Sequence, residues 1–125
     1  MSNPVSISRF EVKSHDRPDE VRAPIKTRVE VVGLEGFTLG RIVLEPGWRW
    51  SECVKPVAKT ESCQVSHVGH CLSGTLVVKL KDGTEKTISA GQSYTIPPGH
   101  DAWNIGKERF VGLEVLSADV YAKPA

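Results

Sequence analysis

Glycine and proline interrupt this chain so often that few stretches could hold a helix of three turns. The 125 residues include eleven glycines and eight prolines, and both residue types interrupt regular helices. The stretches between them are rich in β-branched and aromatic residues, which favour strands. We predict strands over residues 28–32, 37–44, 74–80, 84–88, 93–96 and 109–116. Because turn signals recur about every 8–12 residues, the sequence predicts an all-β antiparallel sandwich or barrel.

The chain divides into three parts. Residues 1–27 are charged and show little apolar periodicity, so we expect an arm that runs over a surface, with an edge strand near 6–12. Residues 28–116 hold the predicted strands, and residues 117–125 form a short tail. Within the strand region, Asp82-Gly83 separates two strands and predicts a two-residue hairpin turn with positive φ at both positions.

Composition excludes several classes of protein. Sixteen basic and fifteen acidic residues give a net charge of +1, so binding to nucleic acid through phosphate neutralisation is not expected. No apolar run approaches the roughly 18–20 residues of a membrane span, and the first residues lack a signal-peptide pattern. Three cysteines cannot all pair within one chain. We therefore expect free thiols and a cytoplasmic protein with no nucleic-acid or membrane partner.

Two glycine-proline patterns resemble the motifs of the cupin superfamily. Gly91, Pro97 and Gly99 reproduce the second motif, in which glycine, five residues, proline, one residue and glycine follow in order. The ends of the first motif fit Gly47 and Gly74. The resemblance implies an antiparallel jelly-roll β-barrel whose corners are marked by these glycines and prolines.

The resemblance fails at the positions of the cupin metal ligands. Cys53 and Lys55 occupy the places of the two histidines of the first motif, and His67 occupies the place of the glutamate. In the second motif the histidine position is Ala102, but His100 lies two residues earlier and has the same strand parity.

Hairpin geometry nevertheless suggests a metal site. If the strands around 53 and 63–72 pair with a turn near Thr60, Cys53 faces His67, and cross-strand neighbours are close enough to share a metal. His100 would complete a set of three ligands with an open position, suited to zinc or iron(II). The alternative is that Cys53 is a small buried residue and His67 a hydrogen-bonded core residue, with no metal or with an organic ligand.

Other residues have competing interpretations. Ser51 and Lys55 share the parity of Cys53 and would contact a small-molecule ligand together with Trp103 at the barrel mouth; Lys55 could otherwise reach solvent. We expect Trp48 and Trp50 to point outward, whereas a one-residue bulge would turn Trp50 inward.

Two cysteines and one histidine are assigned by strand parity. Cys63 and Cys71 share the parity of His67 and either pack in the core, which we favour, or line the pocket. His70 has the opposite parity, so we expect it at the surface.

Two functions follow. The first is a small cupin-domain protein that binds a small molecule in the barrel, non-catalytic or of unassigned activity. The alternative is a metal-dependent cupin enzyme, of isomerase, dioxygenase or decarboxylase type, acting on a small polar or carboxylate-bearing metabolite. The arm without a core of its own and the two outward tryptophans also predict a homodimer.

Overall fold

The computed structural model describes residues 7–63 and 66–115. This part of the chain forms nine strands and two short helices, and both helices lie between the third and fourth strands. The strands are β1 (Glu20–Arg22), β2 (Thr27–Leu34), β3 (Phe37–Leu44), β4 (His67–Ser73), β5 (Thr75–Leu80), β6 (Glu85–Ser89), β7 (Ser93–Ile96), β8 (His100–Trp103) and β9 (Phe110–Val115). The helices are α1 (Trp50–Cys53) and α2 (Lys55–Ala58).

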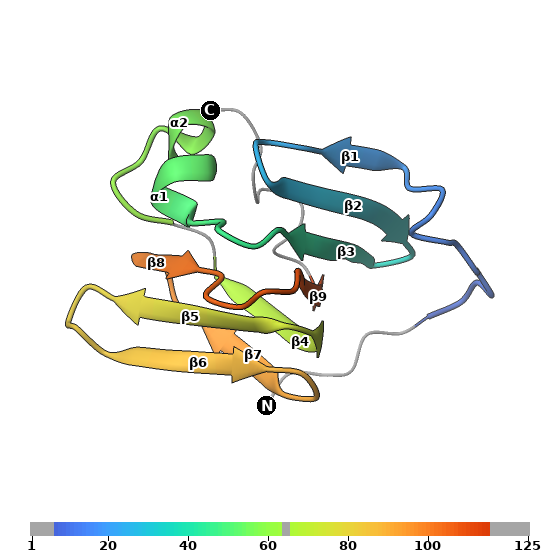
Figure 1. Ribbon diagram of the computed structural model, residues 1–125. Coiled ribbons are helices and arrows are strands. Elements are labelled where there is room, and N and C mark those ends of the chain that lie inside the picture. The colour runs from blue at the N-terminus through green and yellow to red at the C-terminus, as the bar shows by residue number, and fades with distance from the viewer. Residues whose placement is uncertain (1–6, 64–65, 116–125) are drawn as a thin grey trace.

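The strands form two sheets that face each other. The larger sheet has the order β1-β2-β3-β9-β4-β7 and the smaller has the order β6-β5-β8. Every pairing of these strands is antiparallel. Figure 1 shows β1, β2 and β3 in the upper layer and β5, β6 and β8 in the lower one, with the two helices at one end. The all-β antiparallel jelly-roll prediction is therefore confirmed.

The six predicted strands correspond to β2, β3, β5, β6, β7 and β9, with ends that shift by a few residues at most. Residue 116 and the predicted tail 117–125 lie outside the described residues. Residues 7–12 form no strand, so the edge strand expected near 6–12 is wrong over this range. The edge strand of the larger sheet is β1, which pairs with β2 and lies within the segment predicted as an arm.

The predicted hairpin joins β5 to β6. The Gly83 amide donates a hydrogen bond to the Leu80 carbonyl at 3.0 Å, and Gly83 has φ of 92°. Asp82 does not have positive φ. The hairpin is confirmed, but its predicted two-residue turn is wrong. The Leu80 amide donates a hydrogen bond to the Thr84 carbonyl, so residues 81–83 form the turn, and of these only Gly83 has positive φ.

The core lies between the two sheets, and both early tryptophans belong to it. Trp48 and Trp50 are 1% and 2% exposed, so the prediction that they point outward is wrong. Gly47, with φ of 85°, turns the chain at the end of β3, and the Trp48 indole donates a hydrogen bond to Thr27 Oγ1 at 2.9 Å. The chain then enters α1 instead of continuing as a strand, so strand parity does not apply to these residues.

No helix in the described ranges is long and apolar enough to cross a membrane.

The structure explains why position 74, at the end of the first motif, is a glycine. Its φ is 82°, and a Cβ atom there would collide with the Arg109 carbonyl oxygen and lie 2.8 Å from Phe110 Cα. Gly91 has a similar φ of 88°, but a Cβ atom there would meet no atom within 4 Å. We expect Gly91→Ala to lower the free energy of unfolding by about 1–2 kcal/mol, the cost of left-handed backbone for a residue with Cβ. Gly74→Ala should lower it by about 2 kcal/mol more because of overpacking against β9.

Urea unfolding followed by tryptophan fluorescence measures both variants. Equal losses for the two alanine variants would show that the backbone at Gly74 does not approach Arg109 and Phe110 closely.

Candidate metal centre

Three buried side chains meet inside the barrel. The ligand atoms of Cys63, His67 and His100 all lie within 4.8 Å of one another, and each residue is buried. His67 is the first residue of β4 in the larger sheet, and His100 is the first residue of β8 in the smaller sheet. The cluster therefore bridges the two sheets, and its formation depends on their packing.

Backbone hydrogen bonds hold Cys63 beside His100. The Cys63 amide donates to the His100 carbonyl at 2.8 Å, and the Gly99 amide donates to the Cys63 carbonyl at 2.6 Å. These bonds form an isolated antiparallel bridge between Cys63 and His100. The thiol is thus positioned by the start of β8, although Cys63 belongs to no strand.

Each imidazole is oriented by a bond at its Nδ1 atom. His67 Nδ1 lies 2.6 Å from Glu114 Oε1, and His100 Nδ1 lies 2.7 Å from the Pro97 carbonyl oxygen. Carboxylate and carbonyl oxygens accept hydrogen bonds, so both Nδ1 atoms donate. Each ring consequently presents Nε2 as its second nitrogen, and His67 Nε2 lies 3.6 Å from Cys63 Sγ.

Glu114 is itself held in place. It is 4% exposed, and the Tyr94 hydroxyl donates a hydrogen bond to its Oε2 atom at 2.7 Å. Tyr94, Glu114, His67 and Cys63 thus form a continuous hydrogen-bonded chain across β7, β9 and β4.

The cluster shifts the protonation of its members. Burial alone would raise the pKa of Cys63, but hydrogen bonds from His100 and His67 outweigh it and lower the pKa to about 6. Burial alone would lower the pKa of His67, but the Glu114 carboxylate and the bond to Cys63 raise it to about 9. At neutral pH this favours a Cys63 thiolate beside a His67 imidazolium.

One pair of donor atoms in the cluster has the spacing of a tetrahedral zinc site. Zinc holds a thiolate at about 2.3 Å and an imidazole nitrogen at about 2.0–2.1 Å, which places these atoms about 3.6 Å apart. Cys63 Sγ and His67 Nε2 have this separation. The adjoining cavity has a volume of about 20 Å³ and is lined by His67, His100 and Glu114 together with core residues. That is room for about one water-sized group.

His67 and His100, two of the three residues predicted as metal ligands, are brought together, and both are buried as their predicted inward orientation requires. The thiol comes from Cys63 rather than Cys53. The predicted turn near Thr60 between two strands is wrong, because the chain around Cys53 forms α1 and the next residues form α2. Cys53 is buried in the core without joining the cluster.

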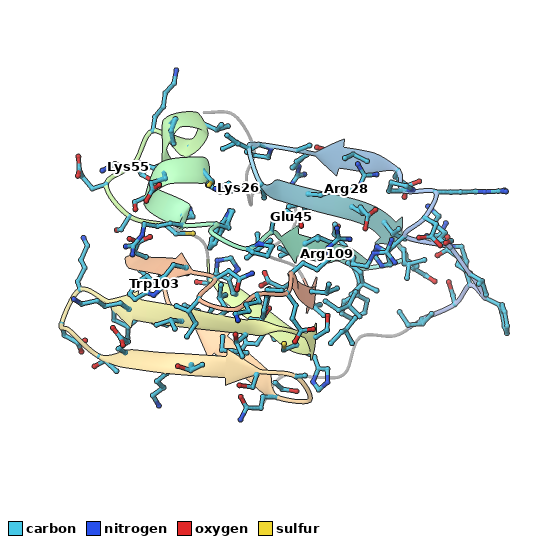
Figure 2. All side chains as sticks on the ribbon, viewed as in Figure 1. Lys26, Arg28, Glu45, Lys55, Trp103 and Arg109 are labelled. Carbon is cyan, nitrogen blue, oxygen red and sulfur yellow. The ribbon has the colours of Figure 1, made fainter. Side chains whose placement is uncertain are left out.

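The three residues predicted to bind a small molecule lie elsewhere. Lys55 is in α2 and its ammonium group lies 3.3 Å from the carboxylate of Glu61. Figure 2 shows Lys55 on the helical segment, away from β4 and β7. The Ser51 amide donates to Asp101 Oδ1 at 3.2 Å.

Trp103 lies on β8 (Figure 2). Its ring is covered by the Arg49 guanidinium at 4.6 Å. Lys55, Ser51 and Trp103 do not line the cavity beside the cluster.

His70 and Cys71 follow the predicted parity. His70 Nδ1 lies 2.8 Å from Ser93 Oγ in an exposed position, whereas Cys71 is fully buried. For Cys63 the favoured interpretation, simple core packing, is corrected by its contact with His67.

Sequence reasoning missed Glu114 and Tyr94. A signal for Glu114 was present, because it shares the parity of Phe110 in a strand whose alternate residues face the core. A carboxylate on such a face requires a buried partner.

No family model matches this chain, and no curated protein matches it. Solved structures resemble it in three dimensions. A protein of unknown function from Rhizobium leguminosarum bv. viciae 3841 superposes with a TM-score of 0.63 at 23% identity, covering 86% of this chain and 96% of that one. The polyketide cyclase RemF from Streptomyces resistomycificus gives a TM-score of 0.61 at 16% identity, over 86% and 78% of the two chains.

A third neighbour, a cupin 2 conserved barrel domain protein from Salinispora arenicola CNS-205, gives a TM-score of 0.59 at 19% identity. It covers 86% of this chain and 88% of that one. Identities this low concern the fold alone. With two facing antiparallel sheets and the motif glycines at its corners, this chain has the jelly-roll fold of the cupin superfamily.

Proposed function

We propose that this chain binds one divalent metal ion, zinc in preference to iron(II), through Cys63, His67 and His100, with one coordination position open. The orientation of the two imidazoles carries the proposal. Each ring is fixed by a bond at Nδ1, and such bonds orient metal-binding histidines and make them more basic. One thiolate with two imidazoles is a donor set suited to zinc.

A zinc ion with an open position acts as a Lewis acid and lowers the pKa of a bound water. The protein's own residues prepare this site. Glu114 orients His67, the Pro97 carbonyl orients His100, and the buried rings of Trp48 and Phe110 line the cavity and exclude bulk water.

The size of the cavity favours this proposal over an organic ligand inside the barrel. A volume of about 20 Å³ accommodates a water-sized group, whereas pockets for small organic molecules measure about 300–1,000 Å³. Of the two functions that the sequence suggested, the metal-dependent cupin therefore has the stronger support.

Metal titration tests the ligand set. In a competition assay with a chromophoric chelator, Cys63→Ser, His67→Ala and His100→Ala should each weaken zinc binding by more than about 100-fold, because each removes a group proposed to contact the ion directly. Glu114→Gln should weaken it by about 10–100-fold, because it removes the charge that orients His67.

Cys53→Ser and His70→Ala are the matched controls, since they alter the same residue types outside the cluster. Both should bind zinc like the parent. Loss of zinc in Cys53→Ser with retention in Cys63→Ser would contradict the proposed ligand set.

The metal-free protein should contain a thiolate at neutral pH. In a Cys53→Ser/Cys71→Ser background, absorbance near 240 nm reports Cys63 alone. Because its pKa is lowered to about 6, the thiolate signal should persist as pH falls from 8 to 7 and disappear only through pH 6. Adding His67→Ala should shift this titration upward. A midpoint near the ordinary thiol value of about 8.5 in the background protein would show that the thiol and imidazole are not paired.

We also propose that the chain forms a homodimer through its N-terminal segment. Phe10 and Val12 are 97% and 84% exposed, although the segment is anchored by hydrogen bonds from Ser8 and Arg9 to Glu35. Anchored and exposed apolar side chains are typical of an interface. The tryptophans that first suggested a dimer no longer support it, because they are buried within their own chain.

Light scattering after gel filtration tests this association. Phe10→Ser/Val12→Ser should shift the mass from two chains toward one at micromolar concentration. Ile105→Ser, which alters another exposed apolar residue, should leave the mass unchanged. A parent protein with the mass of one chain would rule the dimer out.

A further inference from the structure

The open side of the barrel carries a groove much larger than the interior cavity. It has a volume of about 680 Å³ and is lined by residues of β5, β6 and β7. β6 is one edge strand of the smaller sheet and β7 is one edge strand of the larger sheet. In Figure 1 β6 lies in front of β7 at the lower side of the molecule. We call this feature the seam groove. Its volume is that of a pocket for a small organic molecule.

One residue belongs to the linings of both the seam groove and the interior cavity. Ile96 lines both the groove and the interior cavity beside His67 and His100. It pairs with His67 across β7 and β4 and is itself buried. Ile96 is therefore the point at which the two spaces approach each other.

A second contact connects the same two spaces. Tyr94 lines the groove, and its hydroxyl donates to Glu114, which in turn accepts from His67. A molecule in the groove therefore lies against a residue that is hydrogen-bonded into the metal centre.

The lining of the groove indicates the chemistry of its occupant. Val78, Ile88 and Ile96 supply apolar surface, and hydroxyl groups of threonine and serine lie among them. Lys86 is the one charged residue in the lining, with no carboxylate to oppose it. Such a lining suits a small molecule with an apolar body and a negative group.

We propose that the seam groove is the substrate site of the metal centre and that it takes a small carboxylate with an apolar body. The apolar part lies over Ile88 and Ile96, the carboxylate lies toward Lys86, and Ile96 separates the molecule from the metal until its side chain moves. This inference rests on the proposed metal site, but its geometry can be tested with and without zinc.

The first experiment measures how fast an excess of chelator removes zinc from the loaded protein. Ile96→Ala should speed release at least 10-fold, because it opens the wall between groove and metal. Ile42→Ala is the matched control, since Ile42 also lines the interior cavity but not the groove; it should change release less than 3-fold. Equal acceleration by both variants would indicate general loosening of the core and overturn the proposal.

Two further variants protect the test against misfolding, since truncating a buried isoleucine costs about 2–5 kcal/mol. Ile96→Val should still speed release, and Thr84→Trp should slow it, because Thr84 lines the groove and has the same parity as Lys86 and Ile88. Unchanged release in both variants would contradict an entrance through the groove.

The metal-free protein separates failure of this inference from failure of the proposed metal site. In a Cys53→Ser/Cys71→Ser background, iodoacetamide reports access to Cys63. Ile96→Ala should speed alkylation at least 10-fold and Ile42→Ala should not. If the parent binds no zinc but Cys63 is alkylated faster in Ile96→Ala and not in Ile42→Ala, the proposed metal site is wrong and the proposed entrance through the groove is supported. If the parent binds zinc but Ile96→Ala changes neither the rate of zinc release nor the rate of Cys63 alkylation, the proposed entrance is wrong and the proposed metal site is supported.

The ligand class is tested by nuclear magnetic resonance with benzoate, benzyl alcohol and benzamidine as probes. Benzoate should shift the amide signals of β6 and β7 more than the other two, and Lys86→Gln should reduce the benzoate shifts. Lys79→Gln, on the neighbouring strand and outside the lining, should leave them unchanged. Equal shifts with all three probes, or none with benzoate, would overturn the assignment to a carboxylate.

Discussion

The buried carboxylate of Glu114 constrains more of this structure than any other group. It is 4% exposed, and an uncompensated buried charge would cost several kcal/mol, so its partners must be supplied by neighbouring strands. His67 and Tyr94 supply them from β4 and β7. Space for this arrangement comes from glycine: a Cβ atom at Gly69 would lie 2.7 Å from the Tyr94 hydroxyl, and one at Gly112 would lie 2.9 Å from it. Two mid-strand glycines, otherwise unfavourable in a sheet, are thereby explained.

The second constraint is the filling of the barrel by aromatic residues. Trp48, Trp50 and Phe110 are each no more than 2% exposed and surround a cavity of only about 20 Å³. A barrel packed in this way retains room for about one water-sized group beside His67 and His100. The larger groove lies at the open side of the barrel, where β6 and β7 leave the two sheets unpaired.

The candidate site was only partly predictable because some of its residues lie on strands, whose side chains alternate between faces, and one does not. His67 and His100 lie on strands, and the two-residue periodicity of strands assigns their faces correctly. Cys63 lies outside the strands, and its position follows from a backbone bridge to His100 that has no local sequence signal. Cys53 was misassigned because α1 replaces the expected strand after Gly47. Glu114 was detectable in principle as a charge on a core-facing strand position.

The strand content and the corners of the fold were determined by the sequence itself. Strand-favouring segments separated by glycine and proline predict β2, β3, β5, β6, β7 and β9, because chain stiffness and turn geometry are local properties. The four motif glycines, Gly47, Gly74, Gly91 and Gly99, all adopt positive φ. Only the tertiary structure decided which thiol meets the two histidines and that the tryptophans fill the barrel. Those outcomes depend on how two sheets pack face to face, and contacts between residues distant in sequence leave no periodic pattern along the chain.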